Sequence, residues 1–313
     1  MDLLPIIVEH FSSQNKAIFS GTDPGTVVTS VTVPRSLETI FTDINRFNIL
    51  ASLADSPEDS SEDYPDLTPY AFDVDFLPKP YKITAGLINK ITFSGKHQKK
   101  RQQRQKRGVD KETQQKKQSK ENREREIRTK KAYGKITAQE RRNVRSHIRL
   151  PPDAPKPILV HCIGHWVGRN STIKGHCRRG TKKIREQHRV HGYVGITNEY
   201  NTSKICPFCF SKVVLHRTRR VIDGKERIVR LHGAIECIHP RCPSRRKKYT
   251  TRGRDVNASA NIALSGASIV LAADRCPLPP FRRNANHTRY NLANELLSVV
   301  TPELVPRDSI RDE

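Results

Sequence analysis

The nine residues 254–262 read Arg-Asp-Val-Asn-Ala-Ser-Ala-Asn-Ile, and they decide the fold that we expect. Asp255 opens this segment, whose small and apolar residues predict a helix that runs to about residue 273. Two close cysteine pairs precede it at the spacing of a zinc ribbon, in which four thiolates close a tetrahedral site. These cysteines are Cys206, Cys209, Cys237 and Cys242. A zinc ribbon directly before an acidic helix start is a combination that chance rarely produces.

The composition indicates a polyanionic partner. The chain has 313 residues, of which 35% are hydrophobic, so it has room for one large domain or two small ones with a modest core. Its formal charge of +25 favours nucleic acid as the partner. No apolar run approaches the ~20 residues that span a bilayer, and no lipid-binding pattern appears. Seven cysteines suit a reducing compartment with one metal site better than a disulfide framework. Nothing implies a protein partner.

Along the chain, the predicted strands and helices occur in the order of an α/β fold. It has an RNase H-like mixed sheet and an inserted zinc ribbon. Three strands that we expect to be antiparallel come first, and parallel strands with helical crossovers follow. The strands are predicted at 16–22, at 27–33 with an end at Pro34, at 81–93, at 157–163 as a buried parallel strand, and at 193–197. The helices are predicted at 96–149 with breaks near Gly108 and Gly134, at 174–187 in part, and at 255–273, with a short one near 290–300. The pattern of residues 35–50 does not distinguish between a helix and a strand.

Three carboxylates are candidates for a catalytic metal site. Hydrolysis of a phosphodiester by two metal ions needs acidic side chains that converge from the ends of adjacent elements, and Mg²⁺ or Mn²⁺ prefers such oxygen ligands. Asp23 ends the first predicted strand, Asp255 begins the last helix, and Glu199 follows the strand at 193–197. Taken alone, these residues would be a common Asp-Pro-Gly turn, a helix N-cap and an exposed connector residue. His161 and His165 are less favoured alternative ligands at the end of the fourth strand.

The ribbon should hold a structural Zn²⁺ ion, because four thiolates leave no open ligand position. The alternative is two unrelated reduced cysteine pairs, and His239 is expected to be a surface residue. The 27 residues between Cys209 and Cys237 are long for a ribbon. Their arginines and lysines surround a predicted turn at Asp223 and Gly224, which indicates a basic hairpin.

Two further segments have strongly biased charge. Residues 55–75 contain eight Asp or Glu and no Lys or Arg, which predicts a solvated insertion or, alternatively, a shield for the basic surface. Residues 96–149 contain 21 Lys or Arg and 6 Asp or Glu, a net charge of 21 − 6 = +15, with little apolar surface to bury. This basic run is either solvated or a phosphate-backbone contact, and its first part also resembles a nuclear import signal. The candidate nucleic-acid contacts are Lys99, Lys100, Arg101, Arg104, Lys106, Arg107, Arg219 and Arg220.

Residues 16–275 resemble the RuvC-like nuclease domain and zinc ribbon of the TnpB transposon proteins and their eukaryotic relatives, the Fanzor proteins. The resemblance rests on Asp23-Pro-Gly, on the ribbon, and on Asp-x-Asn-Ala-x-x-Asn-Ile from Asp255. Bacterial TnpB has a glutamate after the fourth strand, which this chain lacks. Fanzor proteins instead have a glutamate in a Glu-Tyr-x-Thr-Ser-Lys run, as at Glu199. The resemblance implies a catalytic role for Asp23, Glu199 and Asp255, a guide RNA, DNA as target, and a nuclear location in a eukaryote or a cytoplasmic one otherwise.

The family has an N-terminal half that recognises the target, whereas only 15 residues precede the first predicted strand here. We therefore expect a fragment or a reduced member of the family. The expected organisation is a leader (1–15), a RuvC-like domain with acidic and basic segments (16–200), the ribbon (201–250), a C-terminal RuvC helix (251–275) and a tail (276–313). Three functions remain open: an RNA-guided DNA endonuclease, a non-catalytic zinc-ribbon nucleic-acid-binding remnant of a transposon, and a guide-independent RuvC-like nuclease.

Overall fold

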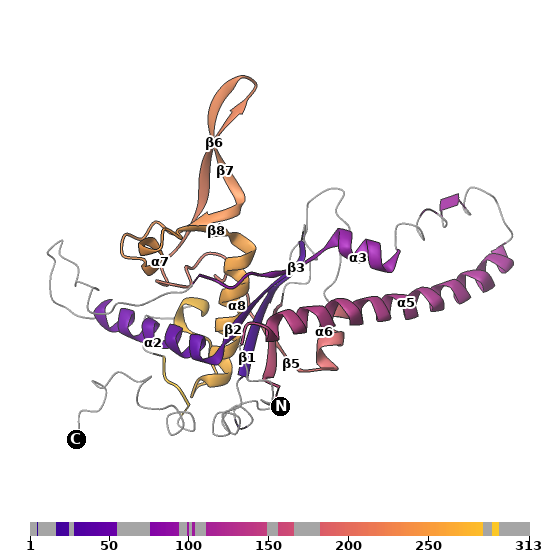
Figure 1. Cartoon of the computed structure of the whole chain (residues 1–313), viewed down its shortest axis with the longest axis horizontal. Coiled ribbons are helices and arrows are strands. Elements are labelled where there is room, and N and C mark those ends of the chain that lie inside the picture. The colour runs from indigo at the N-terminus through magenta and orange to yellow at the C-terminus, as the bar shows by residue number, and fades with distance from the viewer. Residues whose placement is uncertain are drawn as a thin grey trace.

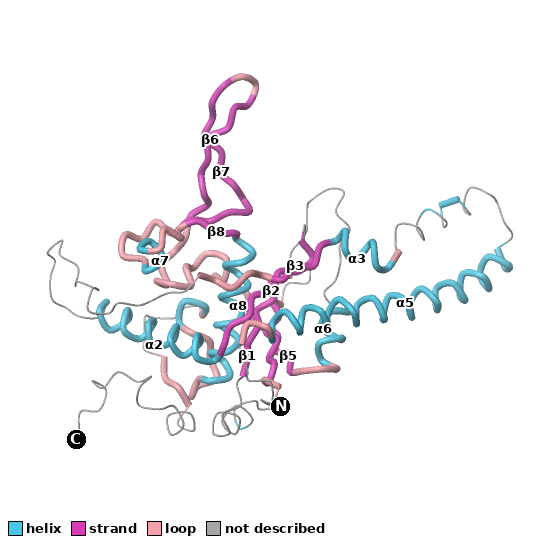
Figure 2. Tube along the Cα trace, in the orientation of Figure 1, coloured by secondary structure: helices cyan, strands magenta, loops and turns pink. Residues whose placement is uncertain are grey.

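The computed structural model describes most of the chain and places a mixed sheet at its centre (Figures 1 and 2). The described residues are 17–24, 28–54, 76–93, 111–148, 156–165, 182–283 and 290–293, with the isolated residues Pro5, Lys99, Gln102 and Gln103. The predicted leader, the acidic insertion at 55–75, the predicted break at Gly108 and the tail beyond residue 293 lie outside them.

Five strands form this sheet in the order β3-β2-β1-β4-β5, with β1, β2 and β3 antiparallel and β1, β4 and β5 parallel. The fold is therefore α/β with a mixed sheet, as the order of elements predicts. All five strands begin within one residue of their predicted positions. The bounds are β1 (Ala17–Asp23), β2 (Val28–Ser36), β3 (Tyr81–Thr84), β4 (Ile158–Gly164) and β5 (Tyr193–Thr197).

Helices cover both faces of the sheet. Alternation along the strands sends Phe19 and Cys162 to one face and Ile18 and Leu159 to the other, where they join different buried clusters. On the first face lie α2 (Leu37–Ala54) and α8 (Arg254–Leu271), and on the second lie α5 (Lys111–Arg145) and α6 (Lys182–Arg189). The sheet is thus the middle layer of three, and its strands are largely buried.

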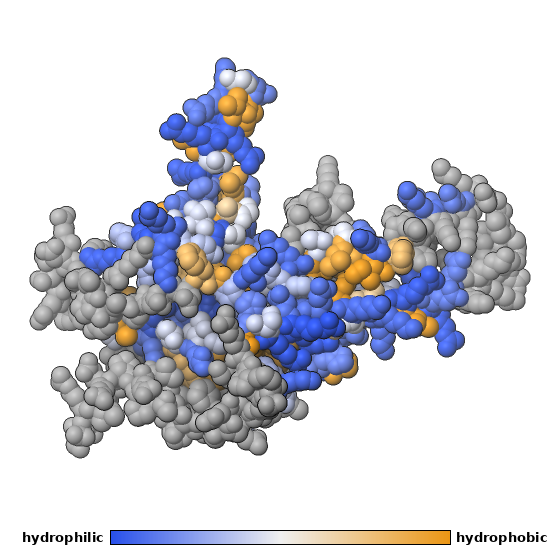
Figure 3. Space-filling view, in the orientation of Figure 1, coloured by the Kyte–Doolittle hydropathy of each residue, from blue (hydrophilic) through white to orange (hydrophobic). Residues whose placement is uncertain are grey.

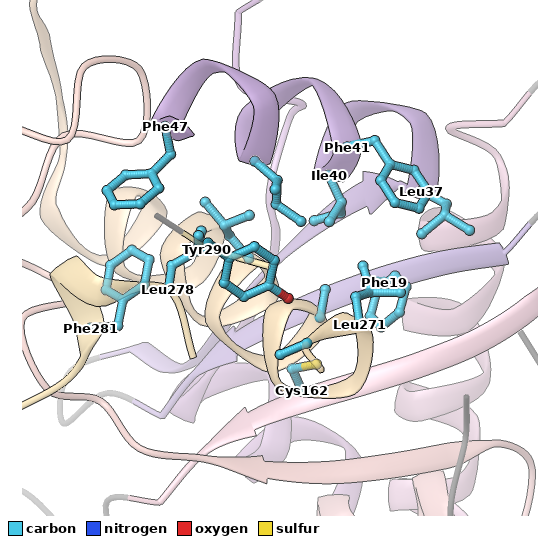
Figure 4. Close-up of a cluster of buried hydrophobic side chains, with 14 of the residues drawn as sticks. Phe19, Leu37, Ile40, Phe41, Phe47, Cys162, Leu271, Leu278, Phe281 and Tyr290 are labelled. Atoms are coloured by element: carbon cyan, nitrogen blue, oxygen red, sulfur yellow. The ribbon is translucent and has the colours of Figure 1, made fainter. Parts of the chain in front are cut away.

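The residues after α8 belong to the main core. Leu278, Phe281 and Tyr290 are buried with side chains of α2 and α8, and Figure 4 shows them facing Phe47. The amide of Ala293 donates to the carbonyl of Leu271 at 2.8 Å. Residues 290–293 are extended and form a bridge at Leu292, so the short helix predicted from residue 290 is absent from this described part. The segment predicted to be a tail therefore holds α8 against α2.

Two strand predictions need correction. β2 continues through Pro34 to Ser36. The pairing with β3 ends at Thr32, so no residue of β3 would accept a hydrogen bond from position 34, and a proline without an N–H costs no hydrogen bond there. The predicted strand at 81–93 is a strand only to Thr84 and then becomes α3 (Ala85–Thr92). Thr84 caps this helix, since its hydroxyl accepts a hydrogen bond from the Leu87 amide at 3.1 Å.

The basic helix also differs from the prediction. α5 runs without a break through Gly134, where the missing side chain leaves room for Gln187 of α6. Its C-terminal half has a buried face with Tyr133, Ile136 and Val144, whereas its N-terminal part extends away from the sheet (Figure 1). The helix is about 52 Å long at 1.5 Å per residue. The prediction that it has no wide face to bury is therefore wrong for the half that packs on β1, β2 and α6.

A buried polar chain connects α5 and α6 to the sheet. Ser20 and His161 are hydrogen-bonded at 2.7 Å, the ring of His161 lies 3.9 Å from that of His188, and His188 contacts Glu140 at 3.0 Å. Glu140 accepts a short hydrogen bond from Thr32. Burial lowers the pKa of His161 well below 6.5, and neighbouring cations lower it further, so the ring is neutral.

None of the described helices is long and apolar enough to pass through a lipid bilayer.

Candidate metal centres and nucleic-acid interface

The three predicted carboxylates come together at the carboxyl ends of the parallel strands. Asp23 is the last residue of β1, and Glu199 lies two residues beyond β5. The same edge receives the first turn of α8, which carries Asp255. Sites in α/β proteins commonly form at this edge, because loops that leave parallel strands converge there.

Close packing of α8 on β1 brings Asp255 to this edge. Gly21 points to α8, and a Cβ atom built there would lie 1.8 Å from the carbonyl oxygen of Ser259 and 2.4 Å from the amide nitrogen of Ala263. The hydroxyl of Ser259 donates to the carbonyl of Val31 at 2.8 Å. The helix therefore touches the strand with its backbone, which the small residues of the helix allow. Asp23 is on the same face as Gly21, two residues further along β1.

Glu199 fills the end of β4. A Cβ atom at Gly164 would lie 2.0 Å from Oε1 of Glu199 and 2.6 Å from its Cδ. The glutamate thus reaches from the loop after β5 to the end of the neighbouring strand, where the sequence itself has no carboxylate. This close approach explains a glycine at the last position of β4. A glycine that ends a strand was a signal available in the sequence, but it does not identify its partner.

The pKa of Asp23 indicates that the three carboxylates lie near one another. Burial, the largest cause, and repulsion from Asp255 and Glu199 together raise the pKa of Asp23 to about 7, and Arg254 partly opposes this shift. The three carboxylates are not found as one tight group of ligand atoms. Within the described residues, only the ribbon cysteines form a group whose ligand atoms all lie within 4.8 Å of one another.

Of the two histidine alternatives, the structure places the ring of His161 away from the carboxylates. His161 points to the face covered by α5 and α6, where it contacts Ser20 and His188. His165 is exposed, and its amide donates to the carbonyl of Thr197 at 3.0 Å.

The four cysteines form a site that could hold a metal ion such as zinc. All four are buried. The Sγ atoms of Cys206 and Cys242 are 3.7 Å apart, and those of Cys209 and Cys237 are 3.6 Å apart. A tetrahedral ion with Zn–S bonds of about 2.3 Å requires S–S separations of about 3.8 Å. The donor set and its spacing therefore fit zinc without rearrangement.

Hydrogen-bond donors and cations surround these sulfurs. Arg252 donates to Sγ of Cys206 at 3.0 Å, and the hydroxyl of Ser244 lies 3.0 Å from Sγ of Cys242. Arg46 of α2 is buried nearby and donates to the carbonyl of Pro207 at 3.2 Å. Four thiolates around Zn²⁺ carry a net charge of −2, which Arg46 and Arg252 offset. Sequence reasoning missed both arginines, because each lies among other basic or polar residues without a distinctive pattern.

The basic hairpin predicted between the cysteine pairs is present and projects from the body (Figure 1). It consists of β6 (Val214–Ile222) and β7 (Lys225–Glu236), and β8 (Thr251–Gly253) joins its base. The predicted turn is confirmed: Asp223 and Gly224 have φ angles of 52° and 72°, as a two-residue hairpin turn requires.

The hairpin places like charges opposite each other. Arg217 is paired with Arg230 across the ladder, and Arg220 with Arg227. Like charges directly opposite destabilise an isolated hairpin. Figure 3 shows the hairpin as mainly hydrophilic with apolar spots. Two apolar side chains of the hairpin, Val221 and Ile228, are 73% and 70% exposed. A polyanion on this surface would relieve the repulsion.

The other predicted nucleic-acid contacts have different outcomes. Arg219 and Arg220 are exposed on β6, and Arg219 lies 3.8 Å from Glu226. Lys99 is exposed in a short helical segment. Lys100, Arg101, Arg104, Lys106 and Arg107 lie outside the described residues.

The short helix α7 (Pro243–Arg246) follows Cys242 in the ribbon, and the 3₁₀ turn η1 (Pro279–Phe281) lies in the main core beyond α8. Comparison with known protein families and with curated proteins finds no match to this chain.

Proposed function

We propose that this chain is a metal-dependent DNA endonuclease of the RuvC type, guided by a bound RNA. The observation that carries the proposal is the convergence of Asp23, Glu199 and Asp255 from three elements, close enough for two of them to raise the pKa of the third. Clustered carboxylates repel each other and cost stability unless cations compensate them. Their placement at the edge of the sheet is therefore a functional arrangement.

A pair of ions would suit three carboxylates that form no single tight group. Two ions about 3.5–4 Å apart need ligands on both sides, so the oxygens need not all lie within the span of one ion. Asp23, Glu199 and Asp255 would hold Mg²⁺ or Mn²⁺, which supplies an activated water and stabilises the leaving oxygen. Gly164 leaves room for Glu199, and the contact at Gly21 sets the position of Asp255.

The topology supports an RNase H-like core. Three antiparallel strands followed by two parallel ones, in the order β3-β2-β1-β4-β5, agree with the arrangement expected from the sequence. In addition, the relocated glutamate reaches the end of β4, where bacterial TnpB would have its own. This detail favours similarity to the Fanzor branch.

A cleavage assay tests the catalytic proposal. Purified chain with its bound RNA is incubated with matching double-stranded DNA and Mg²⁺. We expect Asp23→Asn, Glu199→Gln and Asp255→Asn each to slow cleavage about a thousandfold, which corresponds to about 4 kcal/mol of transition-state stabilisation. The matched control is Asp274→Asn, which removes a carboxylate beyond the opposite end of α8 and should cleave at the wild-type rate. Unchanged cleavage in all three variants would refute the assignment.

Gly164→Ala provides a variant that keeps every carboxylate. The new methyl group would overlap the side chain of Glu199, which can rotate away. We therefore expect a small change in melting temperature but a loss of cleavage similar to that of Glu199→Gln. Wild-type cleavage in this variant would show that the glutamate is not needed in its present position.

The RNA that remains bound after purification at high salt separates the three open functions. One dominant RNA with a constant scaffold and a variable end supports guidance. Cleavage by RNA-free protein supports a guide-independent nuclease, and binding without cleavage supports a non-catalytic remnant.

The raised pKa of Asp23 predicts a pH-dependent metal affinity. Binding of Mg²⁺ or Mn²⁺ requires the ionised carboxylate, and the metal-free group ionises around pH 7. Below pH 7 the apparent Mn²⁺ affinity should fall about tenfold per pH unit, because each ion bound displaces one proton. Calorimetric titration at pH 6, 7 and 8 measures this.

The stability of the metal-free chain should change with pH in the opposite direction to its metal affinity. Ionisation of Asp23 destabilises the fold as the pH rises from 3.8 to about 7. Asp23→Asn should flatten both profiles, and a pH-independent affinity of the wild type would contradict the prediction.

The hairpin should contribute phosphate contacts. Arg219→Gln with Arg220→Gln should reduce the slope of log affinity against log salt by about 1.8 for duplex DNA, from about 0.9 per phosphate neutralised. Lys82→Gln with Lys90→Gln removes two exposed cations from β3 and α3 and serves as the matched control. Fluorescence anisotropy over a salt series measures both, and equal slopes would exclude a direct role for the hairpin arginines.

A further inference from the structure

The loop that carries Glu199 is held by two asparagines of α8. Nδ2 of Asn257 donates to the carbonyls of Thr202 and Ile205 at 3.1 and 2.9 Å. Nδ2 of Asn261 donates to the same two carbonyls at 2.7 and 2.8 Å. Both asparagines are fully buried, so these bonds are shielded from water and strongly directional.

The same loop is bonded to the backbone of Glu199. The amide and hydroxyl of Thr202 donate to the carbonyl of Glu199 at 3.2 and 3.0 Å. The side chains of α8 thus fix Thr202, and Thr202 fixes Glu199. Six residues separate Glu199 from Cys206, so this short loop connects the carboxylate site directly to the ribbon.

Arg252 joins this network to the cysteine centre. Its Nε donates to Oδ1 of Asn257 at 2.8 Å, and its Nη2 donates to Sγ of Cys206 at 3.0 Å. Arg252 is 5% exposed, and its Cζ lies 5.2 Å from the centroid of the Phe208 ring, over the ring face. A buried guanidinium needs its partners, because an unpaired buried charge is costly. A thiolate at Cys206 therefore orients Arg252, which in turn orients Asn257 with its amide toward the Glu199 loop.

We propose that Arg252 is a positioning residue that makes the geometry of the carboxylate site depend on the state of the cysteine centre. This rests on the proposed function of Asp23, Glu199 and Asp255. A centre with its thiolates in place holds Arg252, Asn257 and the Glu199 loop in this hydrogen-bonded arrangement. Loss or oxidation of the thiolates removes one partner of Arg252 and weakens the hold of Asn257 on the Glu199 loop, so that Asn261 holds the two carbonyls without its support.

The test measures metal binding at the carboxylates, not cleavage. Mn²⁺ is titrated by electron paramagnetic resonance into the zinc-loaded chain, and zinc content and melting temperature are measured on the same samples. Arg252→Gln should weaken Mn²⁺ binding about tenfold, as removal of an outer-shell partner does, while zinc content stays at one ion per chain. Asn257→Leu, which cuts the link at its other end and does not touch the cysteines, should give the same loss.

Arg245→Gln is the matched control. Arg245 is another ribbon arginine, exposed, and its hydrogen bonds go to the carbonyls of Ile238 and His239 within the ribbon. Its replacement should leave Mn²⁺ binding unchanged.

The outcomes are distinct. Wild-type Mn²⁺ affinity in both Arg252→Gln and Asn257→Leu would overturn the inference while leaving the proposed function intact. If Asp255→Asn also binds Mn²⁺ like the wild type, the carboxylate site itself is wrong, and the proposed function fails with it. If Arg252→Gln loses zinc, Arg252→Met takes its place, because methionine keeps the contact with Phe208. Its Mn²⁺ affinity is then compared with that of the wild type in the same way.

Discussion

Replacing Gly21 with alanine is expected to destabilise the folded chain by about 3 kcal/mol or more. The added methyl group would lie 1.8 Å from the carbonyl oxygen of Ser259, and both the obstacle and the new atom belong to backbone positions that no side-chain rotation can relieve. α8 would have to move away from β1, which opens the buried cluster on that face and displaces Asp255. Urea denaturation measures the loss as a shift of the midpoint.

Gly195→Ala is the matched control for this substitution. Gly195 lies in the middle of β5 in the same sheet, and nothing lies within 4 Å of a Cβ atom built there. Since alanine restricts the unfolded chain more than glycine does, this change should be neutral or slightly stabilising. Equal stability of Gly21→Ala and the wild type would mean that α8 does not contact β1 through its backbone.

Loss of the cysteine centre is expected to unfold the ribbon. Structural zinc in small domains contributes about 10–16 kcal/mol of apparent binding free energy. The ribbon has few apolar side chains to replace it, since half of the eight buried residues of its cluster are the cysteines themselves. Cys237→Ser should therefore reduce bound zinc from one ion to none and expose the amides of β6, β7 and β8 to hydrogen exchange.

Cys276→Ser is the control, because Cys276 is partly exposed and takes no part in the cysteine group. It should keep full zinc content by colorimetric assay and an unchanged exchange pattern. Retention of zinc by Cys237→Ser would show that the four sulfurs do not act as one ligand set.

The sequence predicted those features that depend on local chemistry. The four cysteines, the turn at Asp223 and Gly224, and the bounds of β5 follow from residue types and spacing alone. Each of these predictions uses information within a few residues of the feature.

The errors arose where a distant partner decides the local structure. Residues 85–92 alternate enough for a strand, but a threonine cap and packing on α5 make them helical. Gly134 predicts a helix break, yet α5 continues because α6 packs against it there. Pro34 predicts a strand end, but the adjacent strand has already ended on that side. The links through Arg252 and Arg46 join residues far apart in the chain, which no local pattern shows.

The buried segment beyond α8 determines where the chain can be shortened. Truncation at residue 275 would look reasonable on composition, because prolines and polar residues dominate the remainder of the sequence. Such a cut would remove Leu278, Phe281 and Tyr290 from the largest buried cluster, together with the paired hydrogen bonds between Asn48 and Tyr290 at 2.9 and 3.0 Å. Expression of the α/β and ribbon portion should therefore retain residues up to 293, and affinity tags belong beyond that point.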